Sequence, residues 1–243
     1  MNRIKLDAID STNSFLKEMA QNTSLENYTV VTANQQKNGK GQMGTSWVSE
    51  PGKNLLFSVF VAFDDMSVKH QLSINYAVSI AVINTLKRYN LPQLSIKWPN
   101  DILSRNKKLC GILVENVMQN NQIKHAVIGI GVNVNQTVFP DFLPDATSMK
   151  SILKTPIDLD KLLAELVVEL KRNIALIGFQ DNDKLKEVYL SFLYKKNIPT
   201  MFKNSEDVLF MGKIIGVSSV GKLQIQLDND TVLEFGIKEV SIA

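Results

Sequence analysis

The sequence predicts an α+β fold with a mixed or antiparallel central sheet, packed helices and a small β-barrel-like domain at the C-terminus. Three observations lead to this prediction. Runs of strand length, rich in apolar and β-branched residues, are interleaved with stretches of helical periodicity. Two neighbouring runs are joined by a short polar turn, which is typical of an antiparallel hairpin. After Lys195 only short β-type runs remain, so we expect domains over residues 1–195 and 196–243.

The first predicted element is a helix in "DSTNSFLKEMA". Asp10, Ser11 and Thr12 are cap-type residues, and an apolar stripe follows them at helical spacing. The elements expected after it are a strand over 28–33, a polar, glycine-rich loop over 34–53, a strand over 54–63 and a long, largely buried helix over 67–88. The strand over 54–63 is apolar on both faces, which predicts a central place in the sheet.

The second half of the larger domain is predicted from the same patterns. Its expected elements are a short strand over 93–98, strands over 108–118 and 124–135, and helices over 158–177 and 181–194. The polar turn between the middle two strands predicts the antiparallel hairpin. In the smaller domain, the runs "VLFMGKIIGVS", "KLQIQLD" and "TVLEFGI" are separated by turn residues and predict β structure throughout.

The composition excludes several classes of protein. Hydrophobic residues make up 44% and charged residues 21% of the chain, which is ordinary for a globular protein. A net charge of +3 is too mild to indicate DNA binding. One cysteine and two histidines argue against a disulfide and against a Cys- or His-based metal site. No apolar run approaches the roughly 20 residues that span a bilayer, and no leader is recognisable, so we expect a cytoplasmic protein.

The stretch "NGKGQMGTSW" at 38–47 matches the pattern G-x-G-x-x-G. A dinucleotide fold requires a helix after the glycines, but Pro51 and Gly52 follow here and then a strand. A P-loop is also excluded, because Thr45 stands where the lysine belongs. What remains is a loop between two strands, with free N–H groups and Lys40. Such a loop either binds an anion or is only a mobile surface loop.

Two further motifs allow both a functional and a structural interpretation. In "IKWPNDIL", Pro99 stiffens a turn that presents Trp98, Asn100 and Asp101, which suits recognition of a ring or is an ordinary turn. In "KKLCGILVEN", Lys108 precedes a strand in which Gly111 can mark the close approach of a ligand or of backbone. Cys110 in the same run is predicted to belong to the core.

The strand over 124–135 shows a period of two. Ala126, Ile128, Ile130 and Val132 face one way, whereas Gly129, Gly131 and Asn133 face the other. One face therefore packs, and the other is nearly free of side chains. Either a ligand or a tightly packed helix accounts for the bare face.

Five motifs follow one another along the chain. They are Ser-Thr-Asn at 11–13, Gln-x-x-Gly-Lys-Gly-x-x-Gly-x-x-Trp at 36–47, Lys-Trp-Pro-Asn-Asp at 97–101, Lys-Leu-x-Gly-Ile-Leu-x-Glu at 108–115 and Gly-Ile-Gly-x-Asn at 129–133. In this order they resemble the biotin–protein ligases, over nearly the whole chain. The resemblance implies a class II synthetase-like catalytic domain that binds biotin and ATP over 1–195 and an SH3-like barrel over 196–243.

The resemblance also implies a reaction and a set of roles. Biotin and ATP, with Mg²⁺, would give biotinyl-5′-AMP, and biotin would then pass to a lysine of a biotin carboxyl carrier domain. The implied catalytic residues are Lys108 and Lys40. The implied biotin-binding residues are Ser11, Thr12, Asn13, Gln36, Lys40, Gly41, Gln42, Lys108 and Gly111. The implied nucleotide-binding residues are Met43, Gly44, Trp47, Trp98, Asn100, Lys108 and Asn133.

The chain departs from the common pattern of that family in its glycine loop. Gly-Arg-Gly-Arg-Arg-Gly-Arg is replaced by "GKGQMGT", so that Lys40 is the only cation there. No DNA-binding domain precedes the first helix, which predicts a ligase without repressor function. A lipoate-type ligase and a non-catalytic regulator that binds biotin or a nucleotide are the alternatives. A homodimer is possible, and Asp101 is a weak candidate for the base that deprotonates the acceptor lysine.

Overall fold

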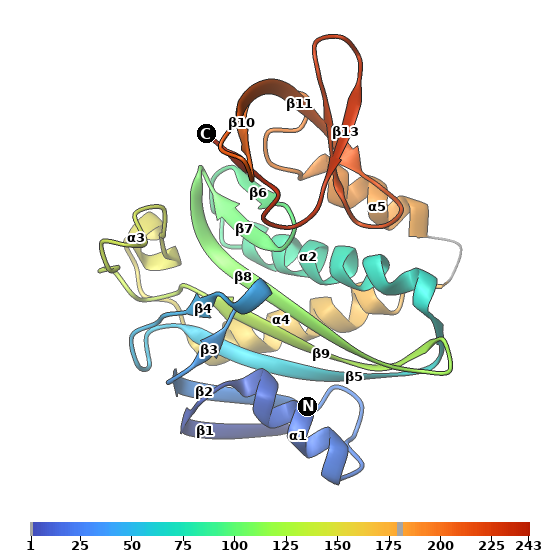
Figure 1. Ribbon diagram of the computed structural model, residues 1–243. Coiled ribbons are helices and arrows are strands. Elements are labelled where there is room, and N and C mark those ends of the chain that lie inside the picture. Colours follow the sequence, from blue (N-terminus) through green and yellow to red (C-terminus); the bar gives the residue numbers. More distant parts are fainter. Residues whose placement is uncertain (1, 179–181) are drawn as a thin grey trace.

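A seven-stranded mixed sheet forms the centre of the computed structural model, which describes residues 2–178 and 182–243 (Figure 1). Its strands are β1 (Arg3–Ile9), β2 (Val30–Gln36), β5 (Leu55–Ser67), β6 (Leu94–Lys97), β7 (Asp101–Ser104), β8 (Lys107–Gln119) and β9 (Gln122–Val132). They lie in the order β1-β2-β5-β9-β8-β7-β6. Strands β1 and β2 are parallel and all other neighbours are antiparallel, which confirms the mixed sheet and the β8–β9 hairpin.

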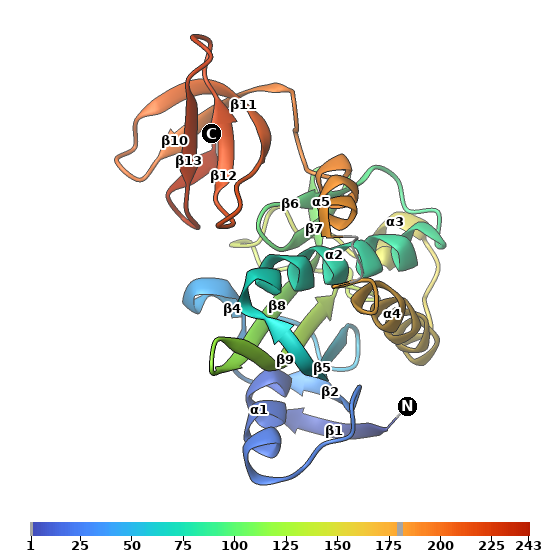
Figure 2. The same ribbon diagram turned by 90° about the vertical axis from the view of Figure 1, so that its right-hand side faces the viewer.

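Helices cover the sheet on both faces. They are α1 (Thr12–Asn22), α2 (Gln71–Lys87), α3 (Met149–Leu153), α4 (Leu159–Ile174) and α5 (Asn182–Ser191). Helices α2 and α4 pack together on one face, and α1 packs on β5 and β9 from the other. The small hairpin of β3 (Gly39–Lys40) and β4 (Ser46–Trp47), joined by the 3₁₀ turn η1 (Gln42–Gly44), lies on the opposite side of the sheet from α4 (Figure 2).

The alternation along β9 decides what each face of the sheet contacts. Ala126, Ile128 and Ile130 are fully buried in the large core with α2 and α4. Val127 points the other way and packs with Leu16 of α1 in a second, smaller cluster. The prediction of one packed and one bare face is therefore confirmed. The glycines of the bare face lie under polar and aromatic side chains, as described below.

A second sheet follows α5. Its strands are β10 (Pro199–Asn204), β11 (Leu209–Val217), β12 (Leu223–Gln226), β13 (Val232–Phe235) and β14 (Val240–Ile242), in the order β13-β12-β11-β10-β14 and antiparallel throughout. It curls tightly beside the larger body (Figure 2). Phe202, Phe210 and Phe235 stack in its core, and the Trp98 indole of the larger body donates to the Gly221 carbonyl at 3.2 Å.

Several predicted boundaries are wrong, and each error has a tertiary cause. The helix predicted over 67–88 begins at Gln71, because β5 continues to Ser67, which pairs with Gln122 at the start of β9, and the 3₁₀ turn η2 (Val68–His70) follows. The strand predicted over 28–33 runs from Val30 to Gln36, paired with β1 on one side and β5 on the other. The loop over 34–53 contains the β3–β4 hairpin. Residue 181, the first of the last predicted helix, lies outside the described residues.

In the part of the chain that the structure describes, no helix combines the length and the apolar character needed to cross a membrane.

The burial of Cys110 leads to a chemical prediction. Its side chain is fully buried, and burial raises the pKa of the thiol far above its usual value, with Asp101 adding to the shift and Lys108 opposing it. The reactive thiolate is therefore scarce in the folded state. We expect iodoacetamide at pH 8 to leave the native protein unmodified, and one alkyl group to be added after unfolding in guanidinium, as measured by mass spectrometry. Rapid alkylation of the native chain would contradict this placement.

Candidate active site

A cavity of about 390 Å³ lies between the β3–β4 hairpin, the start of α1 and the bare face of β8 and β9. It is called the central cavity below. The predicted site residues that line it are Ser11, Thr12, Asn13, Gln36, Lys40, Gly41, Gln42, Trp47, Asn100, Lys108 and Gly111. Gly129 and Gly131 also line it, so residues from all five motifs meet at one cavity.

One end of the central cavity is polar and carries no charge. Ser11 caps α1, and the next two residues, Thr12 and Asn13, are almost fully buried. The Thr12 amide and hydroxyl donate to Gln36 Oε1 at 2.8 and 3.0 Å. The Ser58 hydroxyl lies 2.7 Å from Thr12 Oγ1 and 2.5 Å from Asn13 Oδ1. Each group orients the next, so this end presents fixed uncharged donors and acceptors.

A carboxylate orients this polar end from behind. Asn13 Nδ2 donates to Glu115 Oε2 at 3.0 Å, and Lys17 Nζ lies 2.7 Å from Glu115 Oε1. Burial tends to raise the pKa of Glu115, but the hydrogen bonds from Lys17 and Asn13 and the charges on Lys17 and Lys40 outweigh it and lower the pKa. Glu115 therefore remains ionised at neutral pH and keeps accepting from the Asn13 amide.

The missing side chains on β8 and β9 let other groups approach the sheet closely. A Cβ at Gly129 would lie 2.8 Å from Cγ of Asn13, and a Cβ at Gly131 would lie 2.6 Å from Cε2 of Trp47. A Cβ at Gly111 would lie 2.9 Å from Cζ3 of the same indole. Trp47 thus covers the Gly111–Gly131 part of the bare face, and its buried Nε1 has no hydrogen-bond partner among the described residues.

The other end of the central cavity is charged. Lys108 Nζ lies 2.8 Å from Asp101 Oδ1 and 5.6 Å from the centroid of the Trp47 ring. The Lys108 side chain keeps 39% of its surface exposed and can therefore reach a ligand. Asn100 fixes the turn beside Lys108 through two hydrogen bonds to Ile112. The side-chain amide of Asn100 donates to the Ile112 backbone carbonyl, and the backbone carbonyl of Asn100 accepts from the Ile112 backbone amide at 3.0 Å.

Four predicted nucleotide-binding residues do not line the central cavity. Trp98 and Asn133 lie outside it: Trp98 contacts the second sheet, and Asn133 is 4% exposed, with its amide donating to Leu109 and its carbonyl accepting from Met149. Met43 and Gly44 line an adjacent cavity of about 570 Å³, which shares Trp47 and Lys40 with the central one.

Other residues of the site were missed in the sequence. Ser58 is a single hydroxyl in the apolar run "NLLFSVFVAF", and this isolated polar position could have indicated it. Leu143, Ile237 and Lys238 also line the central cavity. No local pattern marks them, because they reach the site only through long-range packing.

The charged end offers little to a metal ion by itself. Among residues 2–178 and 182–243 no group of three or more His, Cys, Asp or Glu side chains could hold one. Asp101 is the one carboxylate among the residues that line the central cavity, and it is paired with Lys108. A single carboxylate can help to bind Mg²⁺ only when phosphate oxygens provide most of the other ligands, as is common for that ion.

Comparisons with known proteins agree on one family. The family model described as biotin/lipoate A/B protein ligase matches residues 6–133. The bifunctional ligase/repressor BirA of Bacillus spizizenii is 30% identical over 240 residues, which cover 96% of this chain and 70% of that protein. The biotin--[acetyl-CoA-carboxylase] ligase of Mycobacterium tuberculosis is 32% identical over 168 residues, which cover 68% of this chain and 60% of that protein. Among solved structures, the biotin protein ligase from Aquifex aeolicus in complex with biotin and ATP has a TM-score of 0.79 at 25% identity, covering 100% of this chain and 98% of that one.

The close approach at Gly129 leads to a prediction. Gly129→Ala places a methyl group against the Asn13 side chain, so α1 must shift and the contacts with Ser58 are disturbed. We expect the free energy of unfolding to fall by about 1–3 kcal/mol and the Tm in thermal denaturation to fall by roughly 2–12 °C. Gly216→Ala is the control, since its Cβ would meet only Oε1 of the Gln224 side chain, at 3.3 Å. Equal Tm values for Gly129→Ala and Gly216→Ala would show that Asn13 does not require a glycine at position 129.

Proposed function

Since this chain belongs to the biotin/lipoate A/B protein ligase family and is a biotin ligase, we propose that it works through biotinyl-5′-AMP. In this proposal ATP and biotin are its substrates, and a lysine of a biotin carboxyl carrier domain receives the biotin. The roles of the residues that follow are part of the same proposal.

The observation that carries the proposal is the distance between two rows of residues that are paired across neighbouring strands of the large sheet. Leu113, Gly129 and Ser58 are paired in one row, beneath Asn13. Asp101, Gly111 and Gly131 are paired in the next row on this face, beside Lys108. The rows are two residues apart, about 7 Å. A ligand with an uncharged polar ring, a short aliphatic chain and a carboxylate fits this arrangement, and biotin has these three parts.

The first step needs charge neutralisation more than a base. The biotin carboxylate is already a nucleophile, and one of its oxygens bonds to the α-phosphorus of ATP while the bond to the pyrophosphate oxygen breaks. Both reactants are anions and repel each other. Lys108 and Lys40, with the N–H groups of the glycine loop, offset this repulsion and hold the two groups together. A site without a histidine or a reactive cysteine is therefore sufficient.

The second step forms an amide. The ε-amine of the acceptor lysine attacks the acyl carbon of biotinyl-AMP, and AMP leaves with the electrons of the acyl–oxygen bond. The amine must lose a proton, and Asp101 is the candidate base once Lys108 has turned to the phosphate. Mg²⁺ bound to the phosphates would add positive charge in the first step, with Asp101 as its protein ligand.

The polar end argues against lipoate as the substrate. The head group of biotin is a cyclic urea, which has two N–H donors and one carbonyl acceptor that Thr12, Asn13 and Gln36 can satisfy. The disulfide ring of lipoate has no such groups, so it would gain none of the hydrogen bonds, worth about 0.5–1.5 kcal/mol each, that biotin can make at this end. We expect calorimetry to show binding of biotin and at most weak binding of lipoate.

The direct test is transfer of a label. The protein is incubated with ATP, Mg²⁺, a purified carrier domain and either radiolabelled biotin or radiolabelled lipoate. Label on the carrier from biotin alone, with pyrophosphate released, supports the proposal. Transfer from lipoate alone, or binding of biotin without pyrophosphate release, would replace it with one of the two alternatives.

Lys108 has a matched neighbour for a mutational test. Lys108→Ala removes the cation nearest Asp101. We expect the rate of adenylate formation to fall by about 10²–10³-fold, while the far-UV circular dichroism spectrum stays unchanged. Lys107→Ala is the control, because Lys107 is exposed and does not line the central cavity. Pyrophosphate release from both variants at saturating biotin gives the comparison. Near-normal turnover of Lys108→Ala would exclude the role.

Lys40 should act mainly on retention of the intermediate. Lys40 is exposed on β3 and contributes one charge to the rim of the central cavity, so Lys40→Ala should weaken binding of an anion by up to about fivefold. We expect faster dissociation of biotinyl-AMP and little change in the affinity for uncharged biotin amide, measured by stopped-flow fluorescence. An unchanged dissociation rate for the adenylate would contradict this.

A further inference from the structure

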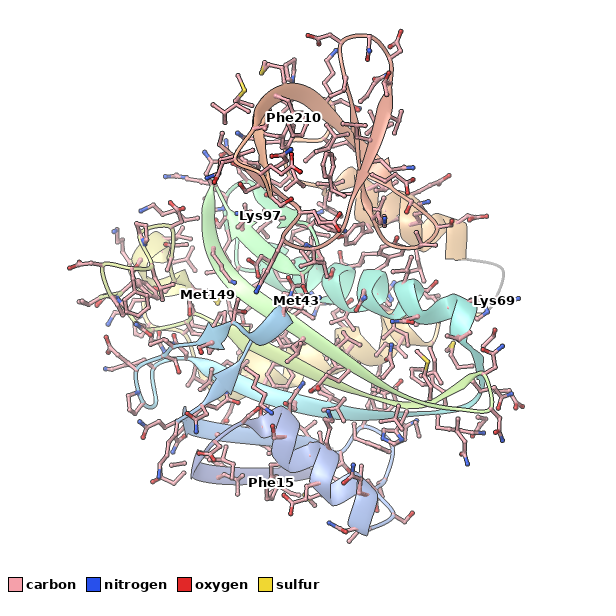
Figure 3. The ribbon with its side chains drawn as sticks, in the orientation of Figure 1. Phe15, Met43, Lys69, Lys97, Met149 and Phe210 are labelled. Carbon is pink, nitrogen blue, oxygen red and sulfur yellow. The ribbon has the colours of Figure 1, made fainter. Side chains whose placement is uncertain are left out.

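The second sheet reaches the central cavity through the turn Gly236–Glu239, between β13 and β14. Ile237 and Lys238 of this turn line the cavity. The Lys238 ammonium donates to the backbone carbonyl of Met43 at 2.7 Å. Met43 is at the tip of the β3–β4 hairpin, and Figure 3 labels it over the middle of the large sheet, below the second sheet.

The tip of the hairpin has few other attachments. Its hydrogen bonds are internal: the Gly41 amide donates to Thr45 at 2.7 Å, and the Thr45 amide donates to Gln42 at 3.1 Å. Within the described ranges, Lys238 to Met43 is the one hydrogen bond between residues 40–46 and the rest of the chain. The Met43 side chain is 61% exposed and does not anchor the tip. The hairpin base is held by the packing of Trp47, and the tip is held by Lys238.

Both partners of this bond have an uncommon backbone conformation. Met43 has φ 50° and Lys238 has φ 68°, in the left-handed region that disfavours side chains other than glycine. The turn around Lys238 is shaped by Glu239, whose carboxylate accepts from the Gly236 amide at 2.5 Å. Such conformations persist where surrounding contacts impose them, and they occur frequently at ligand clamps. The bond therefore joins two residues whose backbone conformations both depend on the contacts around them.

We propose that Lys238 is a positioning residue that holds the glycine loop closed over the central cavity. By binding the Met43 carbonyl, it ties the tip of the hairpin to the second sheet and slows the opening that lets a ligand leave. The identity of that ligand rests on the proposed function, whereas the contact and its effect on the loop do not.

A different role for Lys238 would be to attract the anionic ligand directly. The geometry favours the positioning role, because the ammonium, although at the cavity, is already bound to a neutral carbonyl of the loop. Attraction of the ligand depends on its charge, whereas control of the loop affects charged and neutral ligands alike. This difference separates the two roles experimentally.

The first experiment needs no ligand. Hydrogen exchange of the Gly41 and Thr45 amides is compared in the native chain, Lys238→Met, Lys238→Arg and the control Lys213→Met. Lys213 is an exposed lysine of β11 that does not line the central cavity. We expect exchange to be about threefold to tenfold faster in Lys238→Met and to return toward the native rate in Lys238→Arg. Equal rates in Lys238→Met and Lys213→Met would overturn the proposal.

The second experiment measures release. Dissociation rates of biotin and its uncharged methyl ester are measured by stopped flow for the same variants. A similar acceleration for both ligands in Lys238→Met supports the positioning role, and an acceleration for biotin alone overturns it in favour of direct attraction. If the native chain binds neither ligand, the proposed function fails, and the exchange rates still decide the role of Lys238.

Discussion

The functional site depends on the absence of side chains at three positions of β8 and β9. Without a Cβ at Gly129, the start of α1 lies directly on the sheet, and Asn13 reaches both Ser58 and Glu115. At Gly111 and Gly131 the same absence admits the Trp47 indole. One flat strip of backbone therefore sets the depth at which a helix and a loop can dock. The central cavity is the space that remains between them.

Much of this arrangement could be predicted from local patterns. The period of two along β9 separated its packed face from its bare face, and the cap at Ser11 located the start of α1. The bare face alone could not distinguish a ligand from a packed helix, and the structure shows protein groups on it, Asn13 and Trp47. The predicted start of α2 was wrong because Ser67 is the last residue of β5 and pairs with β9, and the 3₁₀ turn Val68–His70 then precedes the helix.

The prediction of site residues was limited in a similar way. Residues inside the ordered motifs, such as Thr12, Gln36 and Lys108, meet at the central cavity. Trp98 belongs to such a motif, but its indole supports the junction with the second sheet. Lys238 lies almost two hundred residues from the loop it touches, in a stretch without any recognisable motif. A contact between segments so far apart leaves no periodicity in either of them, so only the three-dimensional structure brings Lys238 and Met43 together.

The ion pair between Lys108 and Asp101 affects how an anionic ligand can enter the charged end of the central cavity. In the free protein the two neutralise each other at the charged end of the cavity. An incoming anion that takes the ammonium leaves a partly buried carboxylate beside its own negative charge, and this is electrostatically unfavourable. A second cation that enters with the anion removes the imbalance. Under the proposed function, nucleotide binding would then be an exchange of counter-ions, and a nucleotide already complexed with a divalent ion would bind better than the nucleotide alone.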